Sequence, residues 1–343
     1  MDLMLSGDQE AVRDAIRDVL REQAGGERLR ATIATGDAFD PHLWATAGEL
    51  GWFGLAVPEA AGGAGYGWPE AMVFFVELGR SLAPGPWLGT VLASRVLGAG
   101  GGGRASLSAL LAGRERVALI DDPQDRLGAD DVVDGVDANV ADGGVATHFL
   151  VLGARHVRLV DAGRAVAEAR PCIDPTRRLA RVRFERAASE VVSDDAEAVR
   201  RGAALLAAAE AAGVAERTLE MSVAYAKVRE QFGRPIGSFQ AIKHRCADMA
   251  VRTEVARSAV TYAAVALEEG LAEAPLAVHI AKALATDAAI GNATDNIQNH
   301  GGIGYTWEAE PHLYLKRARL LEHVLGTRCE HLDAIAAPWR SAR

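Results

Sequence analysis

Long Ala-rich helical patterns fill the second half of the chain, and one short stretch interrupts them. From Ala196 onward, apolar residues recur with a period of about 3.6 residues, which is typical of packed helices. Residues 229–240 read Arg-Glu-Gln-Phe-Gly-Arg-Pro-Ile-Gly-Ser-Phe-Gln, and the Phe-Gly pair and the Pro mark a helix boundary. The second half is therefore expected to form a four-helix bundle. The expected helices are Ala196–Val228, Phe239–Gly270, Pro275–Asn296 and Trp307–Ala336.

The first half of the chain predicts another helical region, followed by a small β region. Ser6 and Gln9 form a capping-box pattern that opens a helix, and further helices are expected at Pro41–Leu50 and Pro69–Arg80. Short β-rich runs separated by Gly, Asp and Pro predict strands in the middle of the chain. These runs are Val117–Ile120, Val132–Val133, Phe149–Leu152, Val157–Val160 and Leu179–Phe184.

Composition narrows the class of protein. A chain of 343 residues can bury a large core. Its net charge of −9 argues against a general affinity for nucleic acid or for an anionic membrane surface. The three cysteines lack Cys-x-x-Cys spacing, so neither a disulfide framework nor a metal site is expected. No apolar run approaches membrane-spanning length and no signal-peptide pattern is present, so the expected location is cytoplasmic.

The residues of the interrupting stretch are suited to a nucleotide-like ligand. Arg229 carries a planar, permanently charged guanidinium that matches a pyrophosphate. Gln231 and Gln240 add amide donors and acceptors, while Phe232 and Phe239 supply flat apolar surface.

A second Gly-rich turn follows about sixty residues later, again between two expected helices. It starts at Gln298 and contains Gly301 and Gly302, whose lack of a side chain would let the backbone approach a ligand closely. Two such turns in one helical region predict a shared nucleotide-like cofactor.

Both turns belong to a set of motifs that runs through nearly the whole chain. The others are Leu50–Glu59, Gly62–Trp68, Glu77–Arg80 and Ile236–Met249. In this order they resemble the acyl-CoA dehydrogenase family, whose members bind FAD across a subunit interface. The resemblance implies an α+β, mainly α fold with three domains: an N-terminal helical domain (1–115), a shortened middle β domain (116–194) and a C-terminal four-helix bundle (195–343). It implies FAD contacts at Arg229, Gln231, Phe232, Phe239, Gln240, Gln298, Gly301, Gly302 and Thr327.

The same resemblance implies a reaction for which this chain lacks the base. The family removes the α proton and a β hydride from an acyl-CoA thioester, so a side chain must accept the proton. Members carry a Glu before a Gly-Thr pair, where this chain has Leu325, or at the start of the first bundle helix, where it has Ala203. Neither side chain accepts a proton. Glu322, expected one helical turn before Leu325 and on the same face, is the best substitute.

The expected middle domain also lacks a family feature. Members stack a Trp-containing strand on the flavin ring, whereas this chain has no Trp between Trp87 and Trp307. The half of the cradle that serves a neighbour's FAD therefore looks intact, while the half for this chain's own flavin ring does not.

These observations lead to one leading function and two alternatives. The chain is similar to the short subunits of actinobacterial heteromeric enzymes that act on steroid side-chain thioesters. We expect FAD-dependent dehydrogenation of a bulky or branched acyl-CoA within a heterotetramer, with a homologous partner subunit carrying the Glu and a protein accepting the electrons. The alternatives are a non-catalytic structural subunit that completes the partner's FAD site, and a self-sufficient flavoenzyme with Glu322 as base.

Several conspicuous side chains have simpler interpretations. His244 and His300 are expected to pack or to form hydrogen bonds rather than to catalyse. Arg317 and Arg319, near an expected helix end, are expected to be solvated. Thr327 could cap a helix instead of contacting the flavin.

Overall fold

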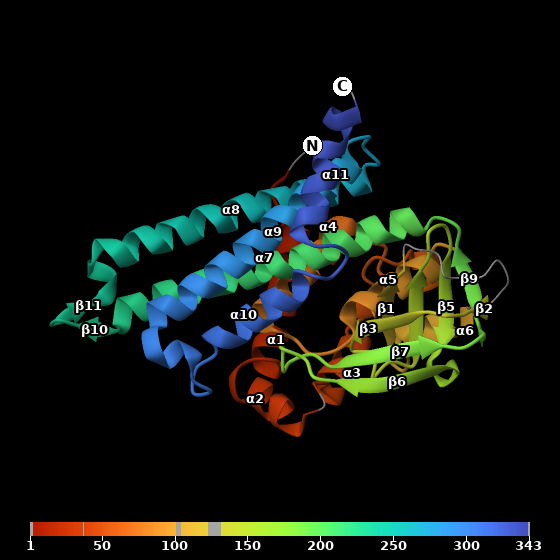
Figure 1. The fold of residues 1–343 in the computed structure, drawn as a ribbon, viewed down its shortest axis with the longest axis horizontal. Helices are drawn as coiled ribbons and strands as arrows, with labels where there is room; N and C mark the ends of the chain where they lie inside the picture. The colour runs from red at the N-terminus through yellow and green to blue at the C-terminus, as the bar shows by residue number, and fades with distance from the viewer. Residues whose placement is uncertain (1–2, 37, 101–103, 123–131, 342–343) are drawn as a thin grey trace. The chain divides into compact units, whose positions relative to one another are not determined.

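Helices form the two ends of the chain and strands form its middle (Figure 1). The computed structural model describes residues 3–36, 38–100, 104–122 and 132–341. Residue contacts divide the chain into two compact units. Unit 1 contains Met1–Glu22, Met72–Leu82 and Ala204–Arg343, and unit 2 contains Gln23–Ala71 and Ala83–Ala203. The α+β, mainly α fold is confirmed, whereas the three-domain boundaries stay a prediction.

The first helices largely follow the predicted pattern. They are α1 (Gly7–Gln23), α2 (Gly26–Thr35), α3 (Pro41–Glu49), α4 (Trp68–Ser81), α5 (Trp87–Gly98) and α6 (Arg104–Leu111). The capping box at the start of α1 is present: the Ser6 amide donates to Gln9 Oε1 at 3.0 Å, and the Gln9 amide donates to Ser6 Oγ at 3.2 Å. Among the described residues, no helix has the length and apolar character that crossing a membrane would require.

Unit 2 contains a β core built from two larger sheets. The four-stranded sheet has the order β1-β4-β5-β9, with β1 and β4 parallel, and the three-stranded antiparallel sheet has the order β3-β7-β6. β2 and β8 form a separate pair. The strands are β1 (Val117–Asp121), β2 (Val132–Val133), β3 (Asp137–Ala141), β4 (His148–Leu152), β5 (Val157–Asp161), β6 (Ala165–Arg170), β7 (Leu179–Phe184), β8 (Ala187–Ala188) and β9 (Glu190–Ser193).

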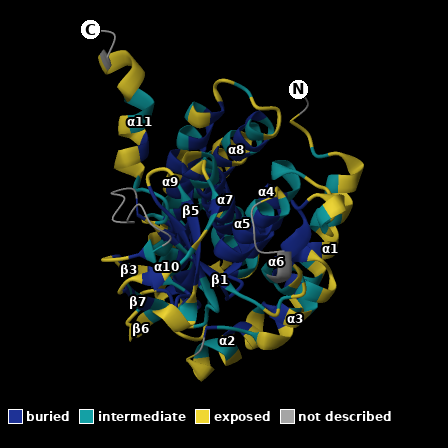
Figure 2. Cartoon of the chain, turned by 90° about the vertical axis from the view of Figure 1, so that its right-hand side faces the viewer, coloured by how far each residue is buried: buried dark blue, intermediate teal, exposed yellow. Residues whose placement is uncertain are grey.

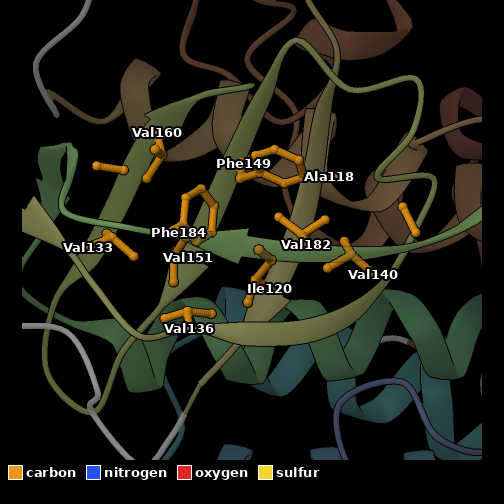
Figure 3. Close-up of a cluster of buried hydrophobic side chains, with 12 residues drawn as sticks. Ala118, Ile120, Val133, Val136, Val140, Phe149, Val151, Val160, Val182 and Phe184 are labelled. Atoms are coloured by element: carbon orange, nitrogen blue, oxygen red, sulfur yellow. The ribbon is translucent and has the colours of Figure 1, made fainter. Parts of the chain in front are cut away.

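Alternation along β7 shows how the sequence directs this core. Ala180, Val182 and Phe184 are buried, whereas Arg181 and Arg183 alternate with them and form ion pairs at the surface. The buried side chains join those of the other sheet in one apolar cluster, in which Phe149 and Phe184 meet edge to face (Figure 3). All five predicted strands are present. Strand β6, which reads Ala-Val-Ala-Glu-Ala-Arg, was not predicted: it is an exposed edge strand without alternating buried and exposed residues (Figure 2).

Unit 1 contains the helical bundle. Its long helices are α7 (Ala196–Val228, from Ala204 in this unit), α8 (Gln240–Glu268) and α9 (Ala274–His300), close to the predicted bounds. α9 lies beside α8, α10 (Pro311–Leu321) and α11 (Arg328–Ser341) (Figure 1). The prediction of one continuous helix over Trp307–Ala336 is wrong. The helix is interrupted between α10 and α11, where Leu325 and Gly326 have positive φ values of 58° and 99°.

Glycines allow α4 and α7 to approach each other closely within unit 1. A Cβ atom on Gly79 would lie 1.9 Å from the carbonyl oxygen of Glu210. A Cβ atom on Gly213 would lie 2.0 Å from the carbonyl oxygen of Val76. Backbone fills the space on both sides, so any larger residue at either position would push the two helices apart.

Arg317 of α10 contradicts the expectation that it is solvated. Its side chain is 0% exposed and donates to the buried carboxylate of Glu210 on α7 at 2.6 Å. A second donor reaches the carbonyl oxygen of Leu82 at 3.3 Å. A guanidinium leaves water only where carboxylate and carbonyl oxygens replace it, and the partner of Arg317 lies 107 residues earlier in the chain. Arg319 is 48% exposed, as expected.

Replacing Arg317 alone should lower the free energy of unfolding more than replacing Arg317 and Glu210 together. We expect Arg317→Met to lower the free energy of unfolding by about 3–5 kcal/mol, because the buried Glu210 carboxylate loses the guanidinium that neutralises it. The double variant Arg317→Met/Glu210→Met should regain most of that loss. Denaturant titration of both variants, with Arg319→Met as the exposed control, measures the difference. Equal losses for the single and double variants would contradict this account.

Candidate cofactor site

The interrupting stretch folds as a short hairpin at the end of the bundle (Figure 1). Its strands are β10 (Glu230–Gln231) and β11 (Arg234–Pro235), which pair antiparallel. Phe232 and Gly233 form the two-residue turn and both have positive φ, 53° and 76°. Two-residue hairpin loops favour turns in which both central residues have positive φ, because their twist matches that of the strands. The sequence predicted a loop of fixed conformation here, and the paired strands provide it.

The conformation and the exposure of Phe232 both destabilise the isolated chain. A bulky residue with positive φ is an outlier, and the Phe232 side chain is 91% exposed. Its ring meets Phe239 edge to face at 6.1 Å, and the Arg234 guanidinium lies 4.2 Å from the centre of the Phe239 ring. Neither the strain nor the exposure stabilises the isolated chain, so the Phe232 side chain is suited to contact another molecule.

The second predicted turn lies directly after α9. Gly301 has φ 66° and ψ −144°, a conformation that is essentially restricted to glycine. A Cβ atom on Gly301 or Gly302 would meet no atom within 4 Å. Gly302 has no positive φ either, so the described residues give no reason for a glycine there. A side chain at either position would project into open space.

Three asparagines on one side of α9 hold this end of the bundle. The Asn292 amide donates to the carbonyl oxygens of Ala215 and Met249, each at 3.1 Å. Asn296 Oδ1 accepts from Ser222 of α7 at 2.9 Å, and Asn299 Oδ1 accepts from Arg245 of α8 at 2.8 Å. Because all three asparagines are buried, these bonds fix where α9 ends relative to α7 and α8.

A cavity of about 460 Å³ lies between the hairpin and the Gly301 turn. The structure thus brings together four of the predicted cofactor residues: Arg229, Gln231, Gly301 and Gly302. Sequence reasoning missed the other lining residues, which are Tyr225, Ile236, Asn299, His300 and Ile303. Among the described residues, no hydrogen-bond or ion-pair partner accompanies the exposed Arg229 guanidinium. Its donors are therefore available to an anion.

His300 adds an acceptor to this donor-rich cavity. Its Nδ1–H donates to the carbonyl oxygen of Asn296 at 2.8 Å, and its ring stacks on Tyr225 at 4.1 Å. Burial lowers the pKa of His300 despite that bond, so the ring is neutral at pH 7. A neutral ring that donates through Nδ1 keeps an acceptor lone pair on Nε2. As expected from sequence, His300 packs and forms a hydrogen bond.

Five predicted cofactor residues do not line this cavity. Phe232 and Phe239 form the aromatic pair of the hairpin, and Gln240 and Gln298 are exposed. Thr327 lies near Lys282, because Lys282 bonds the carbonyl oxygen of the preceding Gly326. From Lys282 to Gly301, α9 advances about 28 Å at about 1.5 Å per residue. Thr327 and the Arg229 cavity therefore belong to opposite ends of one helix.

The positions of the expected base hold no titratable group. Ala203 is 0% exposed, and Leu325 lies in the break between α10 and α11. The helical-face argument for Glu322 is wrong, because α10 ends at Leu321 and Leu325 is not helical. The Glu322 carboxylate, at the C-terminal end of α10, instead accepts from Arg319 at 3.0 Å.

Comparisons with known proteins agree with this architecture. The family models described as the N-terminal and C-terminal domains of acyl-CoA dehydrogenase match residues 6–102 and 197–338. The chain is 38% identical to acyl-CoA dehydrogenase IpdE2 of Mycobacterium tuberculosis, over 91% of each chain. It is similar to the Tcur3481–Tcur3483 steroid ACAD (TM-score 0.89, 26% identity, 98% of each chain). It is also similar to the ChsE4–ChsE5 complex from Mycobacterium tuberculosis (TM-score 0.88, 26% identity, 99% of each chain).

Thr327 caps α11. Of its two interpretations, a helix cap or a flavin contact, the structure therefore allows the first to be tested. Its amide donates to Glu330 Oε2 at 2.7 Å, and the Glu330 amide donates to Thr327 Oγ1 at 3.4 Å. Thr327→Ala should therefore lower the free energy of unfolding by about 1 kcal/mol. Thr327→Ser keeps the hydroxyl and should lose much less. Chemical denaturation of both variants decides: an unchanged midpoint for Thr327→Ala would mean that the hydroxyl does not stabilise the helix.

Proposed function

Because this chain belongs to the acyl-CoA dehydrogenase family, we propose that it is one subunit of a heteromeric, FAD-dependent enzyme that desaturates a bulky or branched acyl-CoA. A steroid side-chain thioester is the substrate class that the similar steroid ACAD supports. The observation that carries the proposal is an asymmetry: Arg229 and Gly302 line an open cavity, but Leu325 and Ala203 occupy the two positions at which the family resemblance implies the base.

The cavity at the hairpin fits the phosphate-bearing part of a flavin nucleotide. Arg229 would bind the pyrophosphate through charge-assisted hydrogen bonds. Gly301 and Gly302 leave the space that a Cβ atom would fill, so the ligand can approach their backbone. The neutral His300 offers an acceptor for a hydroxyl or amino group. These groups would hold a nucleotide without taking part in its redox chemistry.

The reaction needs two further functions. FAD, when bound, accepts the hydride that leaves the β carbon of the thioester. A carboxylate must accept the α proton, and the alkyl side chains of Leu325 and Ala203 cannot. A homologous subunit that carries the Glu would supply that carboxylate and the flavin-ring pocket, and an acceptor protein would take the electrons. This chain would supply the far half of the cradle.

The end of the bundle has the surface that such a partner would cover. Exposed apolar side chains gather on the hairpin and on the turn after α9. They are Val228 at 75%, Phe232 at 91%, Ile303 at 41%, Tyr305 at 73% and Trp307 at 62% exposure. Association would bury the strained Phe232 ring, and its burial would offset the cost of the turn. The similar ChsE4–ChsE5 structure, which is a complex, supports a heteromeric arrangement.

A non-catalytic structural subunit remains the second candidate, and the absence of a base from both family positions favours it. It differs from the first in one respect: a structural subunit would complete the partner's FAD site without any contact to the acyl-CoA. A self-sufficient enzyme would need Glu322 as base, but this carboxylate already forms an ion pair with Arg319 of α10 at 3.0 Å.

The cofactor half of the proposal predicts the effect of one substitution. Arg229→Ala in the assembled protein should weaken FAD retention about tenfold or more, because charge-assisted hydrogen bonds are each worth about 1.5–3 kcal/mol. The fold should persist, since the Arg229 side chain has no partner in the described part of the chain. Flavin absorbance after dialysis measures retention, with Arg319→Ala as the control. An occupancy equal to wild type would reject Arg229 as a flavin contact.

The heteromeric role is tested by comparing the chain alone with the chain plus its partner. Purified alone, the chain should be inactive on every acyl-CoA, because both base positions hold alkyl side chains. It should also be colourless, because no Trp between Trp87 and Trp307 is present to stack on its own flavin ring. Co-expressed with a homologue that carries the Glu, it should yield a flavin-containing complex with one FAD per pair of subunits. Flavin spectra, native mass and turnover give the answer. One FAD per subunit and desaturation by the chain alone would overturn the proposal.

A further inference from the structure

Lys282 of α9 is a buried ammonium group with an unusual set of partners. The residue is 1% exposed. Its Nζ donates to the carbonyl oxygen of Leu321 at 3.0 Å, to the carbonyl oxygen of Gly326 at 3.3 Å and to Thr286 Oγ1 at 3.3 Å. Within the described residues, no carboxylate lies within ion-pair distance of it. Three uncharged oxygens thus take up the three N–H groups of the ammonium.

The Leu321 and Gly326 oxygens lie on either side of the turn that separates α10 from α11. Leu321 is the last residue of α10, where carbonyl groups lack helical partners and attract a cation. Gly326 lies two residues before the start of α11. One side chain from α9 therefore joins the end of α10 to the approach to α11, across a turn of residues 322–327.

A second contact from α11 holds the middle of the same turn. His331 Nε2 lies 2.9 Å from the carbonyl oxygen of Leu325, and because a carbonyl only accepts, Nε2 carries the proton. His331 Nδ1 lies 2.8 Å from His279 Nδ1. In a neutral His331 ring that nitrogen accepts, so His279 is the donor. The bond to Leu325 is thus set by a pair of histidines.

Together Lys282 and His331 bond the carbonyl oxygens of Leu321, Leu325 and Gly326. Two amides of the turn, in contrast, have no acceptor among the described residues. Leu325 and Gly326 both have positive φ, and within the described chain neither backbone N–H has a hydrogen-bond partner. A left-handed Leu costs about 1–2 kcal/mol relative to a right-handed one. The turn therefore needs a contact from outside itself to keep this conformation.

We propose that Lys282 is the positioning residue of this turn: its ammonium draws the carbonyl groups of Leu321 and Gly326 together, and so fixes the direction of the free amides of Leu325 and Gly326. The segment that lacks the base is then not a degenerate loop. It is a shaped turn that presents two backbone donors. This inference concerns the chain's own backbone and does not depend on the proposed function.

The charges around Lys282 are consistent with this role. Burial lowers the pKa of Lys282 to about 8, opposed by the attraction of Glu322 on the turn. His279 on the same helix and His331 on α11 face the same region, and Glu330 of α11 attracts His331. Burial, then Lys282 and His279, lower the pKa of His331 to about 4, so His331 is uncharged near pH 7. The ammonium is thus the cation that holds the turn at neutral pH, and it is lost as pH rises through about 8.

If Lys282 positions the turn, replacing it should loosen the turn without lowering the free energy of unfolding. If Lys282 only fills the core, replacing it should lower both. The pKa of Lys282 is lower in the folded chain than the ordinary value of 10.5, so the unfolded chain binds the proton more tightly between about pH 8 and pH 10.5. Burying the charge therefore costs stability below pH 8. Replacing Lys282 by an apolar side chain of similar length should leave the bundle equally stable or more stable, while it loosens the turn.

Hydrogen exchange on the full chain tests the proposal through these two opposite effects. Lys282→Met should speed exchange of the His323, Val324 and Thr327 amides about tenfold or more at pH 7, because charge-assisted bonds are lost. Exchange in α8 and the thermal midpoint should not show a matching loss. Thr286→Val, which removes one acceptor but keeps both carbonyl contacts, and Lys243→Met, on the exposed side of α8, are the matched controls.

Two results would overturn the proposal. Wild-type protection of the turn in Lys282→Met would show that the ammonium does not hold it. Parallel loosening of the turn and of α8 would show that Lys282 only fills the core. If Lys282→Met does not fold, the wild-type chain gives the same decision. Corrected for intrinsic rates, protection of the three turn amides should fall between pH 7 and pH 9 while α8 stays constant. A flat profile would reject the proposal.

Discussion

The buried amide of Asn292 sets the register of the helical bundle. The facing surfaces of α7, α8 and α9 consist largely of alanine, and apolar burial is not directional. Helices with such smooth surfaces could slide along one another with little change in buried area. The Asn292 amide prevents this, because it reaches main-chain oxygens of Ala215 on α7 and Met249 on α8. Displacement along the axis would leave a buried polar group unpaired, which costs about 1–3 kcal/mol.

This register decides where the cofactor cavity forms. The hairpin follows directly from α7, and the Gly301 turn follows directly from α9, so the axial position of one helix against the other sets the distance between Arg229 and Gly302. Asn296 and Asn299 continue the same polar contacts to the end of α9, beside the cavity. A polar row that fixes register inside an alanine core thus also places the donors of the site. The cavity is a consequence of how the bundle packs.

The sequence predicts those features that depend on local pattern. The 3.6-residue period and the Phe-Gly and Pro signals give the long helices and the hairpin, and β-rich runs between turn residues give five strands. The errors arise where a distant residue decides. Arg317 is buried because Glu210, 107 residues earlier, meets it. The break after α10 persists through Lys282, which lies 44 residues before Gly326. Tyr225 and Asn299 line the cavity through tertiary packing alone, which no local pattern reports.

The two ends of α9 therefore hold two different kinds of turn. At its C-terminal end the backbone opens at Gly301 and Gly302, where missing side chains leave room beside the Arg229 guanidinium, which has no partner among the residues that the structure describes. Near its N-terminal end Lys282 fixes a turn whose side chain at position 325 is apolar, and whose amides at positions 325 and 326 have no acceptor in the described part of the chain. About 28 Å of helix separates them. Burying the Lys282 ammonium costs stability at neutral pH. What the ammonium stabilises in return is the conformation of the turn, whose amides at Leu325 and Gly326 then keep a fixed direction.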